Sequence, residues 1–230
     1  PLLRFFAREP ATHIDLTLPL AEPHPPIYRA LLRVVRVMLP LSYLLSAALI
    51  PQLPSAMERL QVDASWKPGI ASVYFLTRFL VFGLFERYHA WHGRAWAPIA
   101  GGLALAGGFA LTVLAPELAG EAGARALISL IAGLGLFGAG AAIVYACAIY
   151  YAMEVGSASV DAGGAHEALI GCGYTLGPVC GLGAVALAPV LGLRVESATT
   201  LTVLVVSIAI GIAGWRVIAR AGKLRRFSDV

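Results

Sequence analysis

Arg78 is the residue in this chain whose type and position most strongly suggest chemistry. It is the only charged residue in the apolar stretch from Pro68 to Phe85. In a membrane-spanning helix, Arg78 would lie roughly 16 Å of helix rise from one end, near the bilayer midplane. A charge there costs roughly 2.5–3.5 kcal/mol, so we expect the guanidinium to face a cavity or a partner. It could bind an anionic or polyhydroxylated solute, or form an ion pair that fixes helix packing.

Tyrosine hydroxyls are further candidates for lining a solute cavity. Inside a cavity they would hydrogen-bond a solute, although aromatic side chains near helix ends more often form a belt at the lipid headgroups. The candidates are Tyr74, Tyr145, Tyr150 and Tyr151.

His166 and Glu167 form an adjacent pair that could relay protons, because burial and mutual charge would tune the protonation of both groups. They stand where an apolar stretch begins, so they could instead form a gate or cap the helix, which is the reading we favour. Glu154, at the end of the preceding stretch, is a further gate candidate or a partner for Arg87 or Arg94.

Other chemistries lack the residues that they need. His89 and His92 stand three residues apart in a predicted loop, which does not make a metal site. Ser129 and Ser207 have no histidine within the membrane to activate them, and no GxSxG motif is present. The cysteines lie in apolar stretches and are expected to be packing residues: Cys147, Cys172 and Cys180. We therefore expect no enzyme and no bound metal or cofactor.

Long uncharged stretches must position these residues. Five contain no Asp, Glu, Lys or Arg: 37–57, 95–116, 126–153, 168–193 and 197–215. With 68–85, each is near the roughly 20 apolar residues that a helix needs to cross a bilayer. Charged residues make up 13% of the chain, against about 25% in soluble domains. We predict an all-α membrane protein with transmembrane helices at about 34–56, 66–86, 95–116, 124–152, 165–191 and 197–219.

Basic residues predict the orientation of this bundle. Twelve lie in the N-terminal segment, the connection between the second and third helices and the C-terminal tail, against four in the alternate connections. By the positive-inside rule, both termini are cytoplasmic. The net charge of +4 then reflects membrane topology, and we expect no nucleic-acid partner.

Composition divides the chain into three parts. Residues 1–32 are rich in proline and are expected to be a cytoplasmic linker, either a disordered tether or one ending in a short interfacial helix. Residues 33–220 are the six-helix bundle, and 221–230 a basic cytoplasmic tail. The chain begins at Pro1 without an initiator Met, so we expect its N-terminus to lie upstream.

The predicted fifth helix carries glycines at every fourth position: Gly173, Gly177 and Gly181. They form a bare stripe against which another helix can pack, and Pro178 is expected to bend the helix. The predicted fourth helix is also glycine-rich, which indicates either packing or a flexible gating helix; its glycines include Gly133, Gly135, Gly138 and Gly140.

These patterns resemble motifs of the major facilitator superfamily of transporters. The family motif GxxxGPxxGG matches residues 173–183 except at Leu182. A second family motif, GxLaDRxGRR, lies in the cytoplasmic loop between the second and third helices of each half. It is similar to the residues Gly83, Glu86, Arg87, Gly93 and Arg94, with Glu in place of the usual Asp and about four extra residues.

The resemblance covers residues 33–220 and implies the C-terminal half of a twelve-helix secondary transporter. Such a protein moves a small solute by alternating access, here with a missing N-terminal six-helix half as partner, in the same polypeptide or in another subunit. Arg78, in the helix that corresponds to the family's eighth, would face the central cavity. The expected location is a bacterial inner membrane. The alternative is a non-transporting membrane sensor or scaffold of the same fold.

Overall fold

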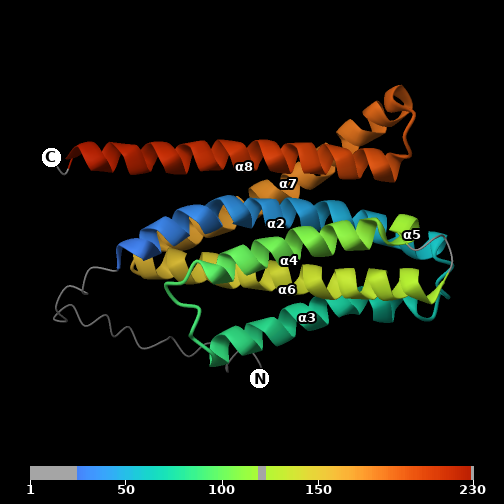
Figure 1. Ribbon diagram of the computed structural model, residues 1–230, viewed down its shortest axis with the longest axis horizontal. Coiled ribbons are helices and arrows are strands. Elements are labelled where there is room, and N and C mark those ends of the chain that lie inside the picture. The colour runs from blue at the N-terminus through green and yellow to red at the C-terminus, as the bar shows by residue number, and fades with distance from the viewer. Residues whose placement is uncertain (1–24, 119–122, 229–230) are drawn as a thin grey trace, which may run out of the picture.

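The computed structural model describes residues 25–118 and 123–228, and the regular elements in those ranges are helices (Figure 1). They are α2 (Pro26–Arg59), α3 (Lys67–Arg87), α4 (Trp96–Val113), α5 (Ala115–Leu118), α6 (Ala124–Val155), α7 (Val160–Leu191) and α8 (Val195–Ser228). All except the short α5 are long and apolar enough to cross a membrane. The predicted six-helix membrane bundle is therefore confirmed for the described part of the chain.

The first and last helices extend beyond their predicted ends. We expected helices at about 34–56 and 197–219, whereas α2 begins at Pro26 and α8 runs to Ser228. Proline is accommodated in the first turn of a helix because that turn needs no N–H group from it. The end of the predicted linker and most of the predicted tail are thus helical. The remainder of the linker lies outside the described residues.

The fifth long helix, α7, also begins earlier than expected. The Ser159 hydroxyl accepts a hydrogen bond from the Ala162 N–H at 3.2 Å and caps the helix, so that it starts at Val160 and not at 165. The helix contains Pro178 and continues past it to Leu191.

The central helix of the bundle is α6, which packs against α2, α3, α4 and α7. Figure 1 shows it between α4 and α3. Glycines permit the closest approaches: a Cβ on Gly133 would lie 2.5 Å from the Thr112 hydroxyl of α4, and one on Gly138 would meet the Tyr74 carbonyl of α3. Gly140 is covered by α4 in the same way. Packing against two neighbours therefore accounts for these three glycines.

The glycine stripe of α7 is only partly covered. Gly173 lies against α2, where an added Cβ would be 2.5 Å from the Pro40 carbonyl oxygen, and one on Gly177 would meet Ala47. Around Gly181, no such neighbour lies within 4 Å. Figure 1 shows α7 crossing the other helices obliquely, with its last turns near the start of α8. The prediction of a tight stripe is right for Gly173 and Gly177 and wrong for Gly181.

Contacts at the two ends of the bundle follow the alternating direction of the long helices. At one end, Tyr28 near the start of α2 meets Tyr150 near the end of α6, with ring centroids 6.0 Å apart. At the other, Arg59 at the end of α2 forms an ion pair with Glu117 of α5, with Nη1 and Oε1 2.8 Å apart. We call these the Tyr28 end and the Arg59 end.

Candidate functional site

Arg78 lies near the middle of α3 and reaches across to α2. Its Nη2 donates a hydrogen bond to the Tyr43 hydroxyl at 3.1 Å, and its Nη1 donates one to the Tyr74 hydroxyl, one turn earlier in α3, at 3.2 Å. Helices α2 and α3 otherwise meet at few points, so this arginine is a principal link between them. Tyr74, one of the candidate cavity tyrosines, thus lies at Arg78, and Tyr43 is a further member of the site.

Three aromatic rings also surround the guanidinium. Its Cζ lies 5.9 Å from the centre of the Tyr43 ring, 5.5 Å from that of Phe82 and 5.6 Å from that of Tyr145. The electron-rich faces of such rings attract a cation, by about 0.5–2 kcal/mol for each contact. Of the predicted tyrosines, Tyr145 of α6 thus belongs to the site.

In the part of the chain that the structure describes, the surroundings of Arg78 contain no carboxylate. Within residues 25–118 and 123–228, none lies within ion-pair distance of its guanidinium. The ion pair considered from the sequence is therefore not found in the described part of the chain. The hydroxyls and rings lower the cost of removing this charge partly from water without neutralising it, which leaves a net positive site in an apolar bundle.

The aromatic contacts continue from this site into α7. The Tyr43 ring meets Tyr174 edge-on at 4.9 Å, and the Tyr145 ring meets the His166 imidazole edge-on at 5.2 Å. His166 is only 3% exposed, and its Nε2 has no hydrogen-bond partner among the described residues. The site and its immediate surroundings therefore draw on α2, α3, α6 and α7.

His166 and Glu167 are adjacent in sequence, but their side chains lie in different surroundings. The imidazole is buried against α6, whereas the Glu167 side chain is exposed. No hydrogen bond joins them. Only His166 faces the interior of the bundle, close to the Arg78 site.

Tyr150 and Tyr151 belong to a separate aromatic cluster at the Tyr28 end. The Tyr150 hydroxyl lies 3.3 Å from that of Tyr28, and the Tyr151 hydroxyl accepts a hydrogen bond from the Gly93 N–H at 3.1 Å. These tyrosines, proposed as cavity residues from the sequence, instead fix the start of α2 to the connection between α3 and α4.

Trp91 and His92 complete this cluster from the connection between α3 and α4. The His92 imidazole stacks on the Tyr150 ring with centroids 4.0 Å apart. Burial lowers the pKa of His92, and the neighbouring His89 lowers it further, while Glu154 acts in the opposite direction. Glu154 is thus placed beside this cluster, away from Arg78.

The loop motif lies at the same end of the bundle. Gly93 has φ +68°, a left-handed conformation that favours glycine, and a Cβ there would be 3.1 Å from the Tyr28 ring. The other four residues of the motif are exposed at the end of α3 or in the connection: Gly83, Glu86, Arg87 and Arg94. Within the described bundle, Gly93 is therefore the one residue of this motif at which the backbone conformation and a close neighbour favour glycine.

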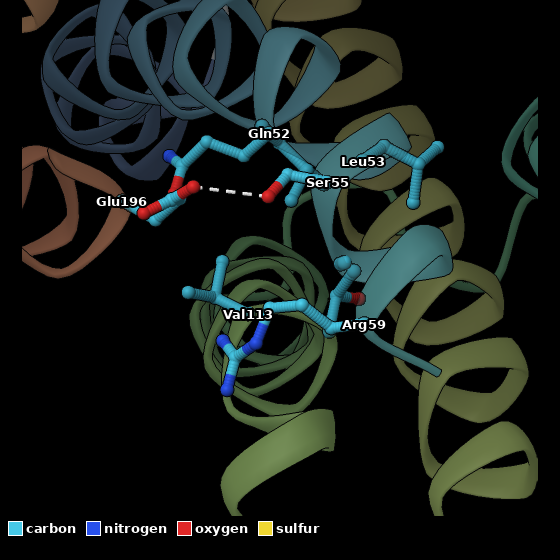
Figure 2. A pocket seen from close by; sticks show the side chains of 9 residues that line it. Gln52, Leu53, Ser55, Arg59, Val113 and Glu196 are labelled. Atoms are coloured by element: carbon cyan, nitrogen blue, oxygen red, sulfur yellow. Dashed lines mark hydrogen bonds between the residues drawn. The ribbon is translucent and has the colours of Figure 1, made fainter. Parts of the chain in front are cut away.

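A polar cluster that the sequence did not predict lies at the Arg59 end (Figure 2). The Ser55 hydroxyl donates a hydrogen bond to Glu196 Oε1 of α8 at 3.0 Å, beside a small cavity of about 20 Å³ that Gln52 and Arg59 also line. Together with the Arg59–Glu117 ion pair, it joins α2 to α8 and α5. Its sequence signal was weak, because Ser55 and Glu196 merely flank apolar stretches.

Two members of the Arg78 site were also missed, Tyr43 and Phe82. Phe82 stands one turn from Arg78 on the same helix, so helical spacing alone could have placed it there. Tyr43 lies on another helix, and only the packing of α2 against its neighbours brings it near. Among the described residues, no three His, Cys, Asp or Glu side chains group as a metal site would require.

The fold and site together define a multi-pass membrane protein with a half-buried arginine site between helices of a six-helix bundle. Comparisons with protein-family models, curated proteins and solved structures give no match to this chain.

Proposed function

We propose that this chain is the C-terminal six-helix half of a secondary transporter similar to the major facilitator superfamily, and that it moves a small solute by alternating access. The observation that carries the proposal is the half-buried, positively charged site at Arg78. Among the described residues its hydrogen-bond partners are two tyrosine hydroxyls. Charged groups inside a membrane bundle commonly mark solute or ion pathways.

The distribution of the site over several helices supports this proposal. Tyr43, Arg78 and Tyr145 come from α2, α3 and α6, and α7 adds His166 behind them. A change in the relative position of these helices would alter the site directly. Solute sites of secondary transporters are likewise formed by several helices near the bilayer midplane, where the two halves rock about them.

We further propose the orientation that the basic residues predict. The Tyr28 end, with the N-terminal segment, the connection from α3 to α4 and the end of α8, would face the cytoplasm of a bacterial cell. The Arg59 end would then face the outside.

The test is uptake by the full-length polypeptide in proteoliposomes. The vesicles would be offered radiolabelled amino acids, sugars, nucleosides and organic acids under an imposed pH gradient. We expect at least one solute to accumulate with the wild type and uptake to fall to background with Arg78→Ala. Arg36→Ala is the matched control. Arg36 is exposed on α2, so this substitution removes a guanidinium group away from the Arg78 site.

Uptake by Arg78→Ala at the wild-type rate would contradict the proposal. Absence of uptake across the whole panel by a folded protein would favour the sensor or scaffold alternative.

A further inference from the structure

A cavity of about 120 Å³ lies between α2, α3 and α6, beside the Arg78 site. Tyr74 belongs to both, since it lines the cavity and its hydroxyl accepts a hydrogen bond from Arg78. On α2 the cavity wall begins at Ser46, one turn beyond Tyr43 towards the Arg59 end. The cavity therefore adjoins the Arg78 site at Tyr74 and extends from there in that direction.

The Arg78 site offers hydrogen-bond donors and no negative charge. A guanidinium carries five N–H donors, and two of them are used by Tyr43 and Tyr74. Each of these tyrosines accepts from Arg78, and its own O–H donates to no described residue. Several donors and one positive charge therefore remain for a ligand that supplies acceptors and a negative charge.

The adjoining cavity is lined almost entirely by hydrocarbon. Its walls include Leu49, Leu53, Ala71, Leu134 and Phe137. The small hydroxyl in the wall, that of Ser46, already donates a hydrogen bond to the Ser42 carbonyl oxygen at 2.8 Å. An engineered apolar cavity of about 150 Å³ holds one benzene molecule. The cavity beside Arg78 therefore suits an apolar group of only a few carbons.

We propose that this site binds a small amphipathic monoanion, of the class of short-chain monocarboxylates. The carboxylate lies on Arg78 and the hydroxyls of Tyr43 and Tyr74, and the hydrocarbon chain fills the cavity towards the Arg59 end. This inference names the solute class for the proposed transport function and rests on the same site. A concave apolar site with a few oriented polar groups at one end is the usual form of a small-molecule site.

The first experiment is equilibrium binding of radiolabelled butyrate to the wild-type, full-length polypeptide in lipid nanodiscs. Unlabelled butyrate should compete fully. Butyramide has the same length without the charge, and sulfate has the charge without the chain, so we expect both to compete at least tenfold more weakly. Equal competition by butyramide would overturn the requirement for an anion. Equal competition by sulfate would overturn the requirement for an apolar body.

Variants then separate the two halves of the site. Arg78→Gln should reduce butyrate binding at least tenfold, while Arg36→Gln, which removes an exposed guanidinium, should not change it. Ala71→Leu narrows the cavity, so it should weaken butyrate binding and leave acetate binding unchanged. Loss of butyrate and acetate binding to the same extent would overturn the assignment of the cavity to the hydrocarbon chain.

Binding and transport fail in distinguishable ways. Arg78-dependent uptake of another solute, without butyrate binding, would overturn the solute class and leave the transporter proposal standing. Butyrate binding without uptake of any solute would overturn the transporter proposal and leave the ligand class standing.

Discussion

Arg78 of α3 donates a hydrogen bond to the Tyr43 hydroxyl of α2 at 3.1 Å, although these two helices have few other contacts. Hydrogen bonds to charged groups contribute about 1.5–3 kcal/mol. This bond is therefore both part of the candidate site and a measurable part of the stability of the bundle.

Removing the Tyr43 hydroxyl should destabilise the protein. Tyr43→Phe keeps the ring that faces Arg78 and Tyr174 but leaves one guanidinium N–H without its acceptor. We expect the free energy of unfolding to fall by about 1.5–3 kcal/mol, as measured by equilibrium unfolding in mixed micelles. Tyr174→Phe is the control, because the Tyr174 hydroxyl has no hydrogen bond among the described residues. Equal losses in the two variants would contradict the assignment.

Gly177 and Gly181 should respond oppositely to the same substitution. Gly177→Ala places a methyl group against Ala47 of α2, and overpacking of this kind costs about 1–3 kcal/mol. The methyl group of Gly181→Ala would have no neighbour to collide with. Because alanine favours a helix more than glycine does, this variant should be more stable by up to about 1 kcal/mol. Thermal unfolding of both variants in the same detergent tests the prediction. A destabilised Gly181→Ala would mean that α7 packs more closely there.

The stability of the Tyr28 end should decrease in mild acid. His92 has a lowered pKa in the folded protein, mainly because it is buried, so the unfolded chain binds its proton more readily. The contribution of neutral His92 to the free energy of unfolding is complete above the ordinary pKa of 6.5. It is lost as the pH falls through the lower pKa that His92 has in the folded protein. His92→Phe keeps the stacking on Tyr150 without a titrating group. Melting temperatures between pH 8 and pH 5 should show a weaker acid loss for that variant, and an unchanged slope would contradict this account.

If transport is driven by protons, His166 and not Glu167 should couple to it. His166 is buried beside Tyr145, whose ring also faces Arg78, whereas Glu167 is exposed. His166→Gln should therefore abolish the response of uptake to a pH gradient. Glu167→Gln should preserve most of it, and the reverse result would restore the exposed carboxylate as the coupling group.

The orientation in the membrane can be tested with two matched cysteine variants in a cysteine-free background. Ala64 lies in the connection from α2 to α3 and Ala90 in that from α3 to α4, and both are exposed. In intact cells, an impermeant maleimide should label Ala64→Cys but not Ala90→Cys. Labelling of both positions, or only of Ala90→Cys, would contradict the predicted topology.

The helices could be predicted because each depends on a local property of the chain. A long uncharged stretch must be helical in a bilayer, whatever its neighbours are. The expected depth of Arg78 in the bilayer rests on the same argument, as does the expectation that its guanidinium needs a cavity or a partner group. Tyr43 could not be found in this way, because its approach to Arg78 depends on how α2 is placed beside α6.

The errors have a similar physical origin. Glycines at 173, 177 and 181 share one face of a helix in any sequence reading, but the oblique course of α7 leaves only the first two against α2. Tyr145 and Tyr150 looked equivalent because both are tyrosines in one apolar stretch. They are more than one helical turn apart, so Tyr145 reaches Arg78 and Tyr150 reaches the Tyr28 end of the bundle.

The glycines of α6 have a mechanical consequence. Gly133 and Gly140 bring its backbone into direct contact with α4, and Gly138 does the same with α3. Because these backbones are packed directly against each other, we expect α3, α4 and α6 to move together as one block. Relative movement is easiest along the seam between this block and α2 with α7. The hydrogen bond from Arg78 to Tyr43 and the ring contact between Tyr145 and His166 both cross that seam.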